Sequence, residues 1–372
     1  MRKSFPFATG IKHSIFIDSA GDVYTCGSNA SGELGLGDTR RRTTPVKINT
    51  LPPIKAVSAG NNFSLFLDFE GNVWGAGKSD FGQLGRILQS DGIISTPEKL
   101  ALPIAIQVVA ASHNYFSMFL DINGNVWACG YAGYGQLGLK DYEADKSKQL
   151  PTLIPCLPAI TDVSAGYYHT LFLDTEMNVW ATGYNAYGQL GLEKADKHIY
   201  SPEKLNLSVA IKQAAAGSYH SLFLDTNGQV WACGHNTYGQ LAVKHLSHVN
   251  KPELCQGLPP IQSICGGYNF STFVDVDGRV WKCGAKINSR NIPELQDGLE
   301  GIQCAQCVSH NIYLDAEGQA WVAGRNCEGQ LGLGDSLVTL DDSQVSVQKL
   351  ECLQGLAWEQ MRFQKTKSAR KS

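Results

Sequence analysis

One sequence pattern recurs along the whole chain and constrains its fold more than any other feature. Its fullest copy reads Ser-Ala-Gly-Tyr-Tyr-His-Thr-Leu-Phe-Leu-Asp at 164–174, Asn-Val-Trp-Ala-Thr-Gly at 178–183 and Tyr-Gly-Gln-Leu-Gly at 187–191. The aspartate that ends the first run recurs at spacings of 50, 53, 53, 51, 50 and 40 residues, as Asp18, Asp68, Asp121, Asp174, Asp225, Asp275 and Asp315. Self-similarity at a fixed period indicates a repeat architecture of seven units.

Each copy predicts four short strands. A run of small and apolar residues such as 54–60 comes first, and an alternating run such as 64–68 follows it. An Asp-x-x-Gly turn then leads into a third strand such as 230–234, because glycine accepts the backbone conformation of a tight hairpin. After a Gly-Gln-Leu-Gly loop, a fourth run such as 201–205 contains proline, which favours an outer edge. The sequence therefore predicts an all-β, seven-bladed propeller of four-stranded antiparallel blades.

The two ends of the chain must meet for such a ring to close. We expect a single propeller over residues 1–363 and a basic, disordered tail over 364–372. The first copy has only a poor first strand, so we expect the C-terminal strand 357–363 to dock on the N-terminal blade, beside the strand that begins at His13. The sixth copy lacks Gly-Gln-Leu-Gly, which predicts a notch in the ring.

Composition excludes several classes of protein. A net charge of -3 and a pI near 6.3 offer no general attraction to nucleic acid or anionic membranes. No segment has the length of a signal peptide core or a membrane span, so we expect no membrane insertion. Four of eleven cysteines, Cys26, Cys129, Cys233 and Cys283, share a repeat position that other copies fill with alanine or threonine. Such buried thiols favour a cytoplasmic location, while a nuclear one, or delivery into a host cell, stays open.

The repeated histidines are predicted to be structural. His13, His169, His220 and His310 share a position that is phenylalanine in three other copies, and phenylalanine can neither bind metal nor transfer protons. We find no motif for a catalytic residue, a metal site or a cofactor. The sequence therefore predicts a protein that is not an enzyme and has no small-molecule substrate.

Tyrosine is the one residue type that exceeds what the fold needs. In an up-and-down blade, the loops after the first and third strands emerge on one face, and ten of the fourteen tyrosines lie on these loops. Tyrosine is enriched at interface hot spots. We predict a partner-binding surface of Tyr115, Tyr131, Tyr167, Tyr168, Tyr184, Tyr187, Tyr219, Tyr238 and Tyr268. Wedging between blades is the alternative, above all for Tyr134, Tyr187 and Tyr238, whereas Tyr115, Tyr168 and Tyr219 are expected on exposed loops.

The motifs Gly-x-x-His-Ser/Thr, Asp-x-x-Gly-x-Val-Trp-x-x-Gly and Gly-Gln-Leu-Gly, at a period near 50, resemble the regulator of chromosome condensation (RCC1) repeat over residues 10 to 363. The founding member of that family is a guanine-nucleotide exchange factor for the small GTPase Ran and also binds chromatin. It places acidic or histidine residues directly before certain repeat histidines. That column holds no aspartate here and reads Lys12, Asn62, Tyr115, Tyr168, Tyr219, Asn269 and Ser309.

The resemblance implies a protein-protein interaction propeller, expected to be a monomer, with a small GTPase as first candidate partner. It implies regulation of that GTPase in the manner of an exchange factor, and a bacterial effector acting on a host GTPase is one form of this function. A non-catalytic structural adaptor is the alternative. A chromatin-associated propeller is the third, and net charge disfavours it.

Overall fold

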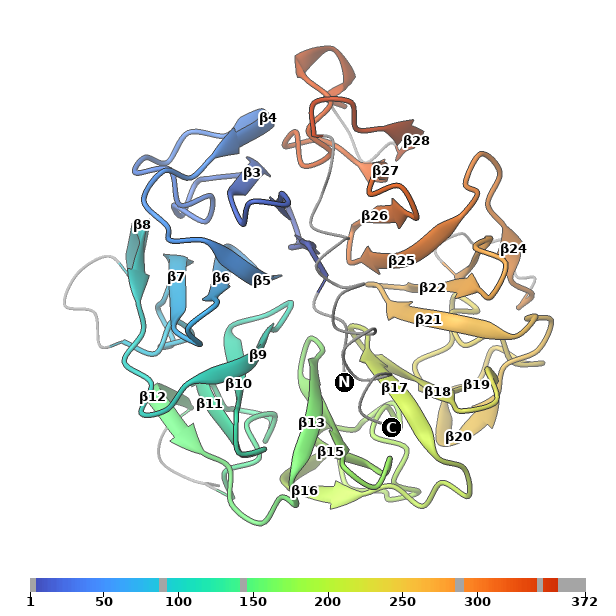
Figure 1. The fold of residues 1–372 in the computed structure, drawn as a ribbon. Coiled ribbons are helices and arrows are strands. Elements are labelled where there is room, and N and C mark those ends of the chain that lie inside the picture. The colour runs from blue at the N-terminus through green and yellow to red at the C-terminus, as the bar shows by residue number, and fades with distance from the viewer. Residues whose placement is uncertain (1–4, 87–91, 141–145, 285–290, 340–343, 354–372) are drawn as a thin grey trace, which may run out of the picture.

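Seven four-stranded antiparallel sheets surround a central axis in the computed structural model (Figure 1). The structure describes residues 5–86, 92–140, 146–284, 291–339 and 344–353. In every sheet the four strands follow chain order from the innermost to the outermost. This arrangement confirms the predicted all-β, seven-bladed propeller.

The strand bounds follow the repeat. Blades one to four consist of β1 (Phe7–Thr9), β2 (His13–Ile17), β3 (Val23–Gly27), β4 (Arg42–Lys47), β5 (Ile54–Ala59), β6 (Phe63–Asp68), β7 (Val73–Lys78), β8 (Ile93–Lys99), β9 (Ile106–Ala111), β10 (Phe116–Asp121), β11 (Val126–Tyr131), β12 (Ser147–Leu153), β13 (Ile160–Ala165), β14 (His169–Asp174), β15 (Val179–Tyr184) and β16 (His198–Lys204). Blades five to seven consist of β17 (Ile211–Ala216), β18 (His220–Asp225), β19 (Val230–Gly234), β20 (Val249–Leu254), β21 (Ile261–Gly266), β22 (Phe270–Asp275), β23 (Val280–Gly284), β24 (Glu294–Leu295), β25 (Ile302–Cys307), β26 (His310–Asp315), β27 (Ala320–Arg325) and β28 (Gln344–Lys349).

The repeated aspartate closes the hairpin between the second and third strands of each blade. One carboxylate oxygen of Asp174 accepts the backbone N–H groups of Glu176 (2.9 Å) and Asn178 (2.8 Å). The other accepts the indole N–H of Trp180 at 3.0 Å. One side chain thus fixes the turn and anchors the third strand, which explains why aspartate and tryptophan recur together.

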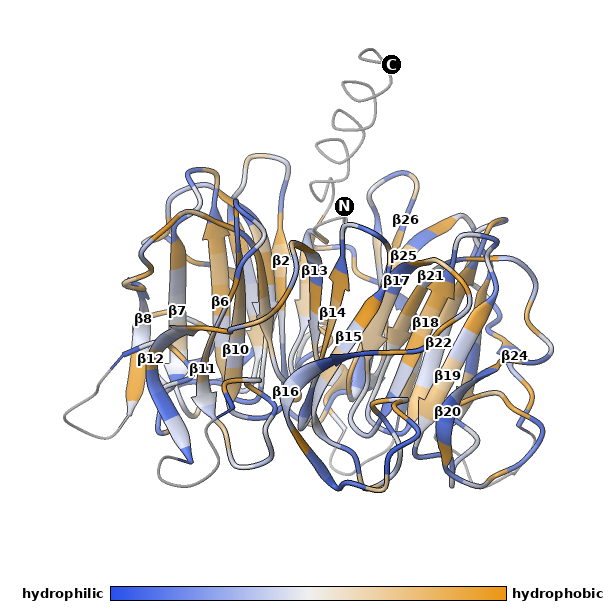
Figure 2. Cartoon of the chain, turned by 90° about the horizontal axis from the view of Figure 1, so that it is seen from below, coloured by the Kyte–Doolittle hydropathy of each residue, from blue (hydrophilic) through white to orange (hydrophobic). Residues whose placement is uncertain are grey.

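The hydrophobic core lies between neighbouring blades. Many strands of the blades are rich in apolar residues, which are orange in Figure 2. Between blades one and two, for example, Ile17 packs in one cluster with Ile54 and Phe66, all buried. Each blade therefore completes the core of the next, as expected for repeats that cannot bury an apolar face alone.

Polar contacts between blades accompany several of the apolar joints, and the repeat histidines take part in four of them. The hydroxyl of Ser221 donates to the backbone carbonyl of Gln189 at 2.6 Å, and the same oxygen lies 3.0 Å from Nε2 of His169. Because the hydroxyl has one proton and uses it for the carbonyl, the Nε2–H of His169 donates to Ser221. The predicted structural role of this histidine column is confirmed.

The N-terminal strand corrects the predicted ring closure. β1 pairs with β2 in antiparallel register, with Phe7 opposite Phe16 and Thr9 opposite Ser14, and β3 covers the other edge of β2. Three residues suffice because Phe7 and Ala8 are buried. The edge of β2 is therefore not available to residues 357–363, contrary to our expectation from the sequence. Residues 357–363 and the tail 364–372 lie outside the described residues.

Blade seven instead meets blade one through the same histidine–serine contact that links blades one and two, four and five, and five and six. Ser14 donates to the carbonyl of Gln330 at 2.6 Å, and its oxygen lies 2.7 Å from Nε2 of His310. Beside this contact Phe7 packs in a buried cluster that includes Leu350. In the described part of the chain, side-chain packing closes the ring.

We expect Phe7→Ala to destabilise the protein by about 3–5 kcal/mol, because it removes a fully buried aromatic ring from the closing joint. Phe69→Ala is the matched control, since the ring of Phe69 is 53% exposed. Urea unfolding of the full chain measures both variants. Equal stability of the two variants would show that β1 contributes little to closure.

The sixth blade carries the predicted notch. Its outer strand β24 has two residues, whereas the outer strands of the other blades have six or seven. The missing Gly-Gln-Leu-Gly loop thus coincides with a shortened outer edge.

Candidate functional site

The strand register brings two sets of loops to one face of the ring. In blade four, the start of the second strand at His169 pairs with the end of the third strand at Gly183, and His220 pairs with Gly234 in the same way in blade five. The loop before each second strand and the loop after each third strand therefore emerge together. We call this side the loop face, and the side with the Asp-x-x-Gly turns the turn face.

A continuous layer of contacting aromatic rings lies on the loop face over blades two to six. Neighbouring rings have centroids 4.5 to 6.3 Å apart, mostly in edge-to-face or tilted contacts. We call this the aromatic surface, and it comprises Phe81, Tyr115, Tyr131, Tyr134, Tyr167, Tyr168, Tyr184, Tyr187, His198, Tyr219, His235, Tyr238, His248 and Tyr268. The structure brings all nine predicted tyrosines into this surface.

Tyr168 and Tyr219 lie at its centre. The ring of Tyr168 is 4.5 Å from that of Tyr134 and 6.1 Å from that of Tyr219, and Tyr219 also contacts Tyr187 at 5.6 Å. Burial raises the pKa of Tyr168 to about 12 and that of Tyr219 further still. Both phenols therefore stay neutral at physiological pH and keep an O–H group able to donate a hydrogen bond.

The repeated Gly-Gln-Leu-Gly loop positions several of these rings. The side-chain oxygen of Gln189 accepts the backbone N–H of Tyr187 at 3.1 Å, and Gln136 accepts that of Tyr134 at 2.9 Å. Both glutamines are fully buried. The repeated glutamine, which was expected to serve only the fold, therefore also fixes the backbone of the tyrosines in the aromatic surface.

A buried asparagine anchors the longer loops. In blade four, Asn185 accepts the backbone N–H of Leu190 and donates its amide group to the carbonyl of Asp196. Asn236 makes the equivalent contacts in blade five, with Leu241 and His245. These side chains replace backbone pairing in the loops, so the rings above them rest on a fixed support.

The exposure of individual tyrosines differs from the expectation. Tyr268 and Tyr238 are the most open, at 43% and 37%, whereas Tyr168 and Tyr219 are half-buried against other rings. Tyr134, expected as a wedge between blades, lies within the surface and contacts Tyr131 and Tyr184. Its exposure class is the same as that of Tyr168.

Sequence reasoning missed one phenylalanine and three histidines of the aromatic surface. His198 stacks on Tyr134 at 5.4 Å, and the rings of His235 and His248 stack at 4.8 Å beside Tyr187. His198 begins the fourth strand and pairs with Tyr184, the last residue of the third. The pairing of the third and fourth strands could have predicted the position of His198, because residues paired with the end of the third strand lie at the loop face.

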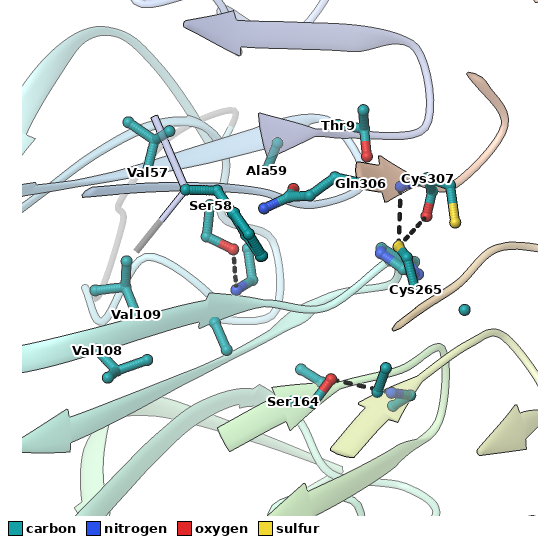
Figure 3. Close-up of a pocket in the computed structure, with 18 of the residues that line it drawn as sticks. Thr9, Val57, Ser58, Ala59, Val108, Val109, Ser164, Cys265, Gln306 and Cys307 are labelled. Atoms are coloured by element: carbon teal, nitrogen blue, oxygen red, sulfur yellow. Dashed lines mark hydrogen bonds between the residues drawn. The ribbon is translucent and has the colours of Figure 1, made fainter. Parts of the chain in front are cut away.

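The innermost strands line a central cavity of about 100 Å³ (Figure 3). Side chains cross-link neighbouring blades there, since Ser58 accepts the backbone N–H of Ala111 and Ser164 accepts that of Ala216. Cys265 similarly accepts the N–H of Cys307 through sulfur at 3.0 Å. Its described lining residues include no aspartate, glutamate, lysine or arginine.

The buried histidines and cysteines of the repeat are poorly suited to covalent chemistry. Burial lowers the pKa of His169 and His220 to about 3, and burial raises the pKa of Cys129 to about 12. These groups stay neutral and inaccessible, unlike a reactive thiol or a general base near neutral pH. Within the described ranges, no group of three or more histidine, cysteine, aspartate or glutamate side chains could hold a metal ion.

Comparison with known families agrees with the blade structure. Residues 116–365 match the RCC1-like domain, and residues 20–67 and 54–83 match the regulator of chromosome condensation (RCC1) repeat. The chain belongs to the RCC1-like family. Two solved structures share its fold: human WBSCR16, with a TM-score of 0.78 and 23% identity over 88% of this chain and 93% of that one, and Prp20p of Saccharomyces cerevisiae, with 0.72 and 24% over 81% and 80%.

Several RCC1-like relatives are longer proteins. The probable E3 ubiquitin-protein ligase HERC6 of Homo sapiens is 28% identical over 67% of this chain and 25% of its own length. The ultraviolet-B receptor UVR8 of Arabidopsis thaliana is 27% identical over 68% and 57%, and the RCC2 homolog of Danio rerio is 34% identical over 48% and 41%. The matched region is less than two thirds of each relative. No helix in the described ranges is long and apolar enough to cross a membrane.

Proposed function

We propose that this RCC1-like propeller is a non-enzymatic interaction protein that binds a protein partner through its aromatic surface, with a small GTPase as the first partner to test. One observation carries this proposal: the nine tyrosines chosen from the sequence lie in one connected surface on one face. These rings form a continuous layer of ring-to-ring contacts over five blades.

The physical properties of the surface suit protein recognition. Tyrosine offers a large contact area, a polar tip and few rotatable bonds, so ordering it on binding costs little entropy. Here the rings already support one another, as Tyr167 and Tyr168 do with centroids 4.6 Å apart. A preorganised surface loses less free energy on association than a flexible one.

Family membership supports the choice of a GTPase. Prp20p was described with its binding to Gsp1p and to histones, so both kinds of partner occur among proteins of this fold. A net charge of -3 disfavours chromatin for this chain. If the protein promotes nucleotide exchange, it does so by distorting the nucleotide pocket of the bound GTPase, since exchange needs no covalent step.

A structural adaptor is the second candidate, and one column of the repeat favours it. The position directly before the repeat histidine carries no carboxylate in any blade. An adaptor would bind without accelerating nucleotide release. We propose a cytoplasmic location in either case, because all eleven cysteines are free. We also propose that the protein is a monomer.

Nucleotide release distinguishes the two candidates. Small GTPases are loaded with a fluorescent guanine nucleotide, and release is followed with the propeller present at substoichiometric concentration. The exchange function predicts accelerated release from one GTPase with turnover. Binding without acceleration would favour the adaptor, and absence of binding across the panel would reject a GTPase partner.

A further inference from the structure

The loop face carries a second feature beside the aromatic surface. In blade one, the loop between β3 and β4 ends in three consecutive arginines, Arg40, Arg41 and Arg42. Arg42 pairs with Gly27 at the end of β3, which places the whole run at the loop face. Blade one adjoins blade two, where the aromatic surface begins at Phe81.

The third arginine braces the loop. The guanidinium of Arg42 donates to one carboxylate oxygen of Asp38 at 2.7 Å and to the backbone carbonyls of Arg40 and Arg41 at 2.6 and 3.3 Å. The other carboxylate oxygen of Asp38 accepts the backbone N–H of Arg40 at 2.9 Å. The amide of the buried Asn29 binds the same aspartate. These hydrogen bonds among Asn29, Asp38 and Arg42 therefore fix the backbone at Arg40 and Arg41.

The first two arginines remain available. Both side chains are exposed, and neither forms an ion pair within the described residues. Two other cations near the loop face are already paired, Lys12 with Glu328 and Lys78 with Asp80. Arg40 and Arg41 are thus two free guanidinium groups on a braced loop.

We propose that Arg40 and Arg41 bind an acidic segment of the protein partner that occupies the aromatic surface. A guanidinium group recognises carboxylates with paired hydrogen bonds, and it is less strongly hydrated than an ammonium group. The partner would therefore combine an area that fits the tyrosines with glutamate or aspartate residues over blade one. This inference rests on the proposed function for the identity of the partner and on the braced loop for its chemistry.

A protein is favoured over nucleic acid as the source of the negative charge. The strength of nucleic-acid binding grows with the number of phosphates neutralised, and two free arginines in an acidic chain neutralise few. The adjoining rings pack against one another, whereas single-stranded nucleic acid needs free ring faces on which bases stack. We therefore expect the acidic groups to come from a polypeptide.

The first test needs no natural partner. Fluorescein-labelled oligoglutamate is titrated with the full chain at low salt, and binding is followed by anisotropy. Arg40→Glu with Arg41→Glu should weaken binding about fivefold or more, because two favourable charges become repulsive. The matched control is Lys204→Glu with Lys212→Glu, which changes the net charge equally at exposed positions near the turn face.

Each outcome of this titration decides the proposal. Loss with the arginine variant alone supports it. Equal loss in both variants, or none in either, overturns it, since net charge alone or another site would then explain the binding. A DNA duplex of matched charge is titrated in the same way. If the wild type binds the duplex more tightly than oligoglutamate, and the arginine variant loses that affinity, a protein is the wrong choice of partner.

The second test separates this inference from the proposed function. For a GTPase that binds, the arginine variant should lower the association rate and its salt dependence with little change in dissociation, as for charges at an interface rim. An unchanged association rate would reject the acidic contact on that partner while leaving the aromatic surface in place. If no GTPase binds, the oligoglutamate titration still decides the role of the two arginines.

Discussion

Acidification from pH 7 to pH 5 is expected to remove most of the folding stability of this propeller. Four histidines are fully buried in the folded state, and a fifth, His113, is half-buried. Burial is the largest cause lowering their pKa, to about 4 for His13 and His113 and to about 3 for His169, His220 and His310. Their ordinary value is 6.5, so the unfolded chain takes up protons first as the pH falls.

The direction and size of the effect follow from linkage. A depressed folded-state pKa contributes stability that is complete above about pH 6.5 and is lost progressively as the pH falls toward the folded-state values of about 4 and about 3. Protonation linked to each histidine lowers the free energy of unfolding by at most about 2 kcal/mol between pH 6.5 and 5. Five histidines together lower it by up to about 10 kcal/mol. That sum is comparable with the whole stability of a typical domain. Urea unfolding at pH 7, 6 and 5 measures it, and a stability that stays constant over this range would contradict the account.

A single substitution isolates the cause. We expect His220→Phe to cost about 1 kcal/mol at pH 7, because three other blades already hold phenylalanine in this column and Ser271 keeps its bond to the carbonyl of Gln240. At pH 5 the variant should have gained about 2 kcal/mol relative to the wild type, since one buried histidine no longer resists protonation. His245→Gln, at an exposed position, is the control and should show no such gain.

The second large effect concerns the glycine that ends the third strand of each blade. We expect Gly183→Ala to destabilise the protein by more than about 4 kcal/mol, a size reserved for severe backbone or core disruption. Gly183 has a φ of 114°, and an added Cβ would lie 2.4 Å from the carbonyl oxygen of Tyr168 and 2.7 Å from the Cα of His169. Because both contacts are backbone atoms, relief requires the strands to separate.

The matched control for this change is Gly298→Ala. Gly298 also has a positive φ, of 77°, but nothing lies within 4 Å of its Cβ position. Its cost should stay near 1–2 kcal/mol, the price of a left-handed conformation without a clash. Circular dichroism and urea unfolding measure both variants, and similar losses for the two would show that the close approach at Gly183 matters less than its φ.

The fold could be predicted because the same sequence motifs recur in seven repeats. Asp174 closes its hairpin and holds Trp180, and the same pair of residue types recurs in six blades, so one good copy interprets the poorer ones. Ring closure could not be predicted in this way. β1 has three residues and no full repeat motif, and its stability comes from Phe7 packing against the last blade, a contact between the two ends of the sequence.

The aromatic surface was predictable in membership but not in arrangement. Loop position placed the tyrosines on one face. The role of His198 depended on its pairing with Tyr184 across two strands, and the half-buried state of Tyr168 depended on rings from neighbouring blades. The brace around Arg42 was equally hidden, because its partners are two backbone carbonyls and Asp38. Such contacts follow from three-dimensional proximity rather than from repeat spacing.

The most direct test of the aromatic surface is the affinity of the propeller for the partner found in the GTPase panel. Tyr168→Ala with Tyr219→Ala removes the two central rings, and Phe69→Ala with Ile122→Ala removes two exposed apolar side chains near the turn face. We predict that the tyrosine variant loses more than about 2 kcal/mol of binding free energy, roughly thirtyfold in Kd, while the control stays within about twofold of the wild type. Unchanged affinity in the tyrosine variant, with its fold intact by circular dichroism, would show that the aromatic surface does not bind this partner.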